Sequence, residues 1–179
     1  MSSEETKESL VTTRSVGVKF GLIMAAVSVA YFMVLSVSGV DMTQGLGRWA
    51  SVVINIVIIF LAHKSFKDNG DGYMSYGQGF TIGFWMSLIS SAISSAFTWV
   101  YVKFVDTSFI QTMLEKQEEA MVERGMSDEQ VEQAMEMTAK FMTPESMLIF
   151  GLIGGIIVLL IVTAIVGIFT QKKNPEPFN

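Results

Sequence analysis

Four apolar runs without a charged residue limit what this chain can fold into. They cover residues 20–40, 49–62, 79–102 and 147–170, which are 21, 14, 24 and 24 residues long. At about 1.5 Å per helical residue, 24 residues reach about 36 Å, enough to cross a hydrocarbon core of about 30 Å. The runs therefore predict an all-α polytopic membrane protein with four transmembrane helices.

The predicted spans are somewhat longer than the uncharged runs. They cover about residues 17–40, 45–64, 79–103 and 145–170 of a single membrane domain, residues 1–179. The second span is the weakest, because its 14 uncharged residues cover only about 21 Å. Extending it to 45–64 places Arg48 and Lys64 at its ends, where long basic side chains can reach the interface. Trp49 beside Arg48 is typical of an interfacial anchor.

The distribution of basic residues predicts the orientation. With four spans, one side carries seven bases: Lys7, Arg14, Lys19, Lys64, Lys67, Lys172 and Lys173. The short connection on the other side carries only Arg48. Including Lys103 and the loop 104–146 changes the tally to seven against five, but that loop is acidic and partly remote from the bilayer. Because positive loops stay inside, we expect both termini in the cytoplasm.

Residues 105–143 form a predicted extracytoplasmic insert, an acidic helical hairpin between spans three and four. Residues 104–146 contain ten acids and three bases. Apolar residues recur at helical spacing on both sides of Gly125, a residue suited to ending a helix. Ser127 and Gln130 have the spacing of a capping box that opens the second helix. Thr143 followed by Pro144 is typical of the start of the fourth span.

Two features of the insert leave alternatives open. Its methionine-rich stripes can pack against each other or the membrane face, or can bind varied partners; ordinary packing is the simpler interpretation. The pairs Glu115/Glu119 and Glu132/Glu136 stand four residues apart on a helix. They can grip a divalent cation, but more often such pairs keep a helix soluble and away from anionic lipid.

Several chemistries are excluded or disfavoured. The chain has no cysteine, which excludes disulfides, thiolate zinc sites and cysteine nucleophiles. It has no basic stripe for nucleic acid, and no motif for a cofactor, a metal or a catalytic group. No ionisable residue lies in the four apolar cores, which argues against proton relays and ion-coupled transporters. His63, the single histidine, is expected to be an interfacial residue at the end of the second span.

Small and hydroxyl-bearing residues predict how the spans associate. Three glycine pairs have the small-xxx-small spacing that lets helix backbones approach closely: Gly17/Gly21, Gly79/Gly83 and Gly151/Gly155. In the third span, Ser87, Ser91, Ser94 and Thr98 follow one helix face, flanked by Ser90 and Ser95.

We expect this hydroxyl stripe to face another span, because hydroxyls have no partner in lipid apart from their own helix. Asn55, in the middle of the second span, is a candidate partner since a buried amide needs hydrogen bonds. The alternative is a hydrated path lined by hydroxyls.

Residues 68–80, with the sequence Asp-Asn-Gly-Asp-Gly-Tyr-Met-Ser-Tyr-Gly-Gln-Gly-Phe, run into the third span, which continues to Tyr-Val-Lys-Phe-Val-Asp at 101–106. These segments, the order of the elements and the acidic insert resemble a family of four-span inner-membrane proteins of Bacteroidota, catalogued as domain of unknown function 4199. The resemblance covers nearly the whole chain. It implies a bacterial inner membrane and four spans, but no activity and no functional residue.

Two functions remain open at this stage. The first is a non-enzymatic structural, oligomeric or accessory protein, whose partners are the bilayer and either a second copy or another membrane protein. The second is a small channel or transporter whose path follows the hydroxyl stripe of the third span. A membrane enzyme is disfavoured because the sequence offers no catalytic constellation.

Overall fold

The protein is mostly helical in the part that the computed structural model describes, residues 11–38 and 45–175. In chain order the elements are α1 (Thr13–Ser38), α2 (Gly45–Asp68), α3 (Tyr76–Val100), the π-helix η1 (Tyr101–Val105), α4 (Phe109–Glu123), α5 (Asp128–Phe141) and α6 (Pro144–Thr170). The only β-type pairing among these residues is an isolated bridge between Met74 and Lys172. The predicted all-α class is confirmed.

Four of these helices are long and apolar enough to cross a membrane. They cover Thr13–Ser38, Trp49–Asp68, Tyr76–Val105 and Pro144–Thr170. The weak second run is thus part of a helix of membrane length, which ends at Asp68 rather than at the expected Lys64. The prediction of four membrane-spanning helices is confirmed in this sense of length and composition.

The surface of the helices is far more apolar than that of a water-soluble protein, and some polar side chains lie inside. Side chains buried in the structure include His63, Ser87 and Thr163. The exposed surface of α6, by contrast, is made of large apolar side chains: Ile149, Phe150, Ile153, Ile157, Val158, Ile161, Ile165, Ile168 and Phe169. A continuous apolar surface of this size needs a nonpolar environment, as the outer face of a multi-pass membrane protein has.

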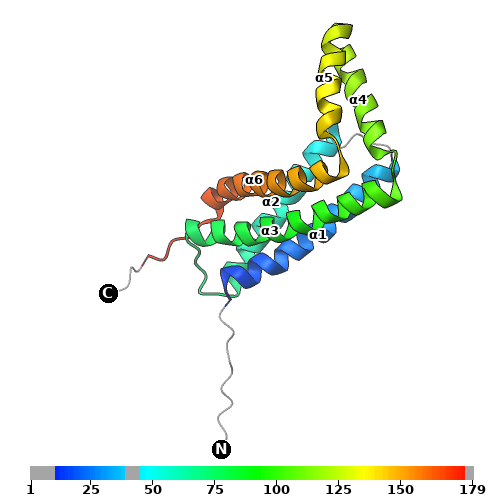
Figure 1. Ribbon diagram of the computed structural model, residues 1–179. Helices are drawn as coiled ribbons and strands as arrows, with labels where there is room; N and C mark the ends of the chain where they lie inside the picture. The colour runs from blue at the N-terminus through cyan, green and yellow to red at the C-terminus, as the bar shows by residue number, and fades with distance from the viewer. Residues whose placement is uncertain (1–10, 39–44, 176–179) are drawn as a thin grey trace, which may run out of the picture. The chain divides into compact units, whose positions relative to one another are not determined.

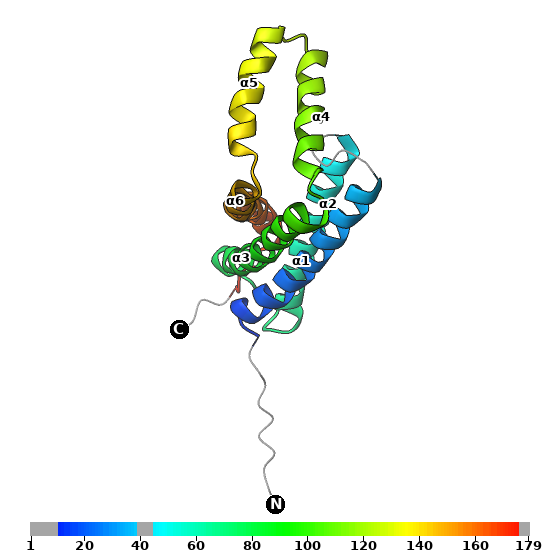
Figure 2. The same cartoon turned by 45° about the vertical axis from the view of Figure 1, so that its right-hand side comes forward.

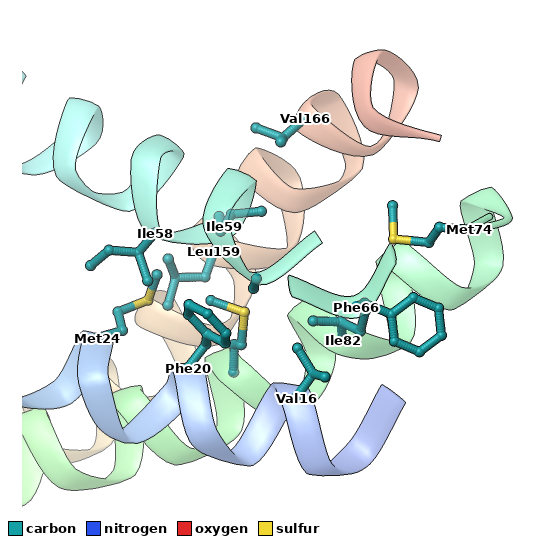
Figure 3. Close-up of a cluster of buried hydrophobic side chains, with 12 residues drawn as sticks. Val16, Phe20, Met24, Ile58, Ile59, Phe66, Met74, Ile82, Leu159 and Val166 are labelled. Carbon is teal, nitrogen blue, oxygen red and sulfur yellow. The ribbon is translucent and has the colours of Figure 1, made fainter. Parts of the chain in front are cut away.

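The chain divides into two compact units. Of the described residues, the first unit contains those up to Ser90 and those from Ile156, and the second contains Ser91–Gly155. Within the first unit, α1, α2 and parts of α3 and α6 lie side by side (Figure 1). Their buried side chains form one apolar cluster, shown in Figure 3, to which each of these four helices contributes.

Glycines bring α1 close to α3 in the first unit. A Cβ atom placed on Gly17 would lie 2.8 Å from the carbonyl oxygen of Ile82 and 2.5 Å from Cβ of Trp85. A Cβ on Gly21 would lie 3.2 Å from Cα of Met86. The two glycines therefore form a flat strip on α1 against which the backbone of α3 packs.

The second unit contains α4 and α5, which run side by side and are joined by a turn (Figure 2). The turn has the predicted local features: Gly125 has a positive φ of 78°, and Ser127 and Gln130 form a reciprocal capping box. The start of α6 is also as predicted, because Thr143 Oγ1 accepts a hydrogen bond from the Ser146 amide at 3.1 Å. Before α4, Asp106 Oδ1 accepts a hydrogen bond from the Ser108 amide at 3.1 Å.

We expect Gly17→Ala to destabilise the protein, because its new methyl group would meet the α3 backbone. Overpacking of this kind costs about 1–3 kcal/mol. Gly77→Ala is the matched control: nothing lies within 4 Å of a Cβ at Gly77, and alanine favours the helix by up to about 1 kcal/mol. Reversible unfolding in mixed micelles measures both, and equal stability of the two variants would contradict the predicted close contact.

Candidate functional site

The hydroxyl stripe of α3 is buried over most of its length, although along a slightly different line from the expected one. Ser87, Ser90, Ser91 and Ser95 are buried, whereas Ser94 and Thr98 are only partly buried. Ser87 Oγ donates to the Phe84 carbonyl at 2.9 Å, Ser90 Oγ to that of Met86 at 2.7 Å, and Ser95 Oγ to that of Ser91 at 2.6 Å. These hydroxyls thus satisfy themselves on their own helix and leave a small, smooth face.

In the first unit, this face of α3 packs against α6. A Cβ placed on Gly83 would overlap the side chain of Thr163, coming within 2.7 Å of its Cβ. A Cβ on Gly167 of α6 would in turn lie 3.3 Å from the ring of Tyr76. The absence of side chains at these two glycines is therefore what allows the contacts.

In the second unit, the roles of the two helices are exchanged. A Cβ placed on Gly155 of α6 would lie 2.6 Å from Oγ of Ser91, and one on Gly151 would lie 3.4 Å from Cβ of Ser95. From Ser91 to Ser95 the contact moves four residues up α3, and from Gly155 to Gly151 it moves four residues down α6, as antiparallel helices require. A glycine of one helix thus meets a hydroxyl residue of the other in both units.

Two buried hydroxyl oxygens have no hydrogen-bond partner within the described residues of this face. Thr163, only 1% exposed, has an unpaired Oγ1, and Ser94 has an unpaired Oγ. Asn55, the expected partner of the stripe, is partly buried, and within the described part of the chain no hydrogen bond joins it to Ser87 or Ser90. Its pairing with the stripe stays a prediction.

His63 corrects the sequence interpretation most clearly. The side chain was expected to reach out to the interface, but it is fully buried, with 0% exposure. Its Nδ1 lies 2.7 Å from Thr170 Oγ1 at the end of α6, and its Nε2 lies 3.1 Å from the Gly79 carbonyl oxygen at the start of α3. One imidazole therefore joins three helices.

The hydrogen bonds of His63 define which ring nitrogen carries hydrogen. A carbonyl oxygen can only accept, so Nε2 donates to Gly79. In the neutral ring, Nδ1 then accepts from the hydroxyl of Thr170. That hydroxyl also lies 2.9 Å from the Val166 carbonyl oxygen. The single hydroxyl hydrogen of Thr170 can therefore be donated either to His63 Nδ1 or to the Val166 carbonyl oxygen.

Further contacts near His63 join α2, α6 and the segment before α3. Lys67 Nζ donates to the Thr170 carbonyl at 2.8 Å, which satisfies a terminal carbonyl of α6. The backbones of Met74 and Lys172 exchange two hydrogen bonds of 2.9 Å, and Met74 is fully buried. Lys172 Nζ lies 5.2 Å from the ring centre of Tyr73. We call His63, Lys67, Met74, Gly79, Thr170 and Lys172 the His63 cluster.

Sequence reasoning missed this cluster because its members lie in three separate segments. The available signal was weak: His63 and Lys67 stand one helical turn apart, on the face of α2 that also carries the buried Ile59 and Phe66. Within the described residues, no three of the His, Asp and Glu side chains are grouped in a way that would hold a metal ion. The hydrogen bonds of the cluster join the end of α2 to α6 and to the start of α3.

We expect His63 and Thr170 to be energetically coupled, because their side chains are hydrogen-bonded to each other and are buried. His63→Ala alone should destabilise by about 1–3 kcal/mol. A double-mutant cycle of His63→Ala with Thr170→Val should give a coupling of about 0.5–2 kcal/mol in micelle unfolding. Thr81→Val is the matched control, since its hydroxyl bonds the Gly77 carbonyl on the surface of α3. Equal coupling with Thr81→Val and with Thr170→Val would refute the link.

Comparison with known proteins assigns the chain to a family. The family described as "Protein of unknown function (DUF4199)" matches residues 19–172, which include α2 to α6 and most of α1. No curated protein and no solved structure matches the chain. The match covers well over half of the chain and agrees with the resemblance of residues 68–80 and 101–106. The chain therefore belongs to the DUF4199 family.

Proposed function

We propose that this chain is a non-enzymatic accessory or structural protein of a bacterial inner membrane, which acts through contacts with a partner. The main support for this proposal is the close packing of α3 against neighbouring helices. The hydroxyls of Ser87, Ser90 and Ser95 bond their own helix, and Gly83 leaves no room for a methyl group beside Thr163. A face packed this closely holds helices together.

The proposed orientation places both ends of the chain in the cytoplasm and the α4–α5 pair outside. Support comes from the basic residues near the C-terminal ends of α2 and α6 and at the start of α1. Lys64 and Lys67 lie near the end of α2, Lys172 and Lys173 follow α6, and Arg14 lies in the first turn of α1. The ends of α2 and α6 are neighbours in the first unit (Figure 1), so their positive charges gather there. An accumulation of this kind is typical of a cytoplasmic face.

A second candidate function is a small channel or transporter along α3. The observation that favours it is the unpaired, buried Oγ1 of Thr163, because a passing water or solute can satisfy such an oxygen. A protein that acts only through contacts between helices needs no path for water or solute.

Flux measurements separate the two candidates. We expect liposomes containing the protein to leak K⁺ and glycerol no faster than empty liposomes, with gramicidin as the positive control for ions. The triple variant Ser87→Ala, Ser91→Ala, Ser94→Ala should behave in the same way. It should lose less than about 1 kcal/mol of stability per residue, because the bonds of Ser87 are local. Flux that the wild type carries and the stable triple variant lacks would establish the channel instead.

Reporter insertions test the orientation. Alkaline phosphatase should be active when inserted in the turn between Arg124 and Ser127, and inactive when fused after Lys173. Green fluorescent protein should fluoresce only at the second position, because it does not fold when exported through the general secretory route. Equal phosphatase activity at the two positions would overturn the proposed topology without affecting the helix contacts described above.

A further inference from the structure

We propose that the space between α4 and α5 is a docking groove for a cationic amphipathic helix of a partner protein. The groove has a volume of about 610 Å³ and is lined by both helices of the pair. Figure 2 shows α4 and α5 side by side along their length. The proposal depends only on this second unit, and not on the orientation of the chain in the membrane.

Part of the groove lining is apolar, and we call this part the floor. Its apolar lining residues are Leu114, Val122, Val131, Met135 and Ala139. Val131 is buried, but Val122 is 57% exposed, so the two stripes leave part of their apolar surface uncovered. Two helices that fully covered each other would bury both stripes. The uncovered strip is suited to the apolar face of a third helix.

Most of the polar lining residues are acidic, and we call these residues the walls of the groove. Five carboxylates line it, from Glu115 and Glu118 on α4 and from Asp128, Glu132 and Glu136 on α5, and no lysine or arginine does. Only Glu136 has an ion pair among those observed in the described residues, with Lys140 at 2.8 Å. Negative walls around an apolar floor complement a helix with one apolar face and lysine or arginine beside it.

Charge also argues against the other obvious occupants. Residues 105–143 carry nine acids against three bases, so a second copy of the hairpin would bring like charge to like charge. An anionic lipid surface is repelled for the same reason. Lengths agree with a helical partner: α4 and α5 have 15 and 14 residues, or about 21 Å, the length of a helix of about four turns.

The test uses the full chain in phosphatidylcholine nanodiscs and a fluorescent 14-residue peptide of leucine and lysine arranged at helical spacing. Fluorescence anisotropy measures its Kd, with empty nanodiscs as the blank. A scrambled peptide of the same composition, which has the same charge but no apolar face, should bind at least several-fold more weakly. Equal binding of the two peptides would overturn the helical occupant.

Two pairs of matched variants locate the site. Glu132→Gln removes a wall charge, whereas Glu129→Gln removes an exposed charge of the same helix that does not line the groove. Val122→Ser changes the floor, whereas Met137→Ser changes a 64% exposed residue outside it. We expect Glu132→Gln and Val122→Ser each to raise Kd about two- to fivefold, and the two controls to leave it unchanged.

Each alternative outcome decides the question. If Glu132→Gln and its control act equally, binding is nonspecific attraction to acidic helices, and the groove is not the site. If Val122→Ser leaves Kd unchanged and high salt abolishes all peptide binding, the groove attracts positive charge without recognising an apolar helix face, and the proposal fails. Circular dichroism and thermal unfolding of all four variants ensure that the comparison is between folded proteins.

Discussion

Close contact between a glycine of one helix and the backbone or the first side-chain atoms of a neighbouring helix is the interaction on which the rest of this structure depends. Lipid tails are as apolar as leucine, so apolar helices gain little by leaving lipid for each other. What remains is dispersion at short range, which falls off steeply when atoms separate by even half an ångström. Gly17 and Gly83 in the first unit and Gly155 in the second each provide such an approach, against Trp85, Thr163 and Ser91 respectively.

Hydrogen bonds between polar groups add to the stability that close packing provides. In a bundle with an apolar exterior, an unsatisfied polar group cannot turn outward to water, so its partners must come from inside. Ser87 and Ser90 find them on their own helix, and His63 finds them on α3 and α6. The local bonds leave helix association to packing, whereas the bonds of His63 also select which helix ends meet. For this reason the histidine cluster defines the arrangement of the first unit more than the serines do.

The sequence predicted the elements better than their contacts. Length and hydropathy were enough for four apolar helices, and spacing was enough for the capping box at Ser127. The expected stripe from Ser87 to Thr98 follows a straight helix face, but the buried one steps by four residues through Gly83, Ser87, Ser91 and Ser95 and drifts about 40° around the helix at each step. Such drift arises when a neighbouring helix crosses at an angle, which one helix alone does not encode.

His63 escaped prediction for a related reason, since its burial depends on Gly79 and Thr170, 16 and 107 residues away. The α4–α5 pair shows the opposite balance, because its turn and caps are local and were readable from spacing. The spacing of residues along the sequence does not determine the distance between the apolar stripes of the two helices. Carboxylates on both walls repel across the groove, and repulsion of that kind opposes closure of the helices over Val122. A cationic helix that entered would remove the repulsion and cover the apolar floor at once. Occupation and tightening of the hairpin would then be one coupled event.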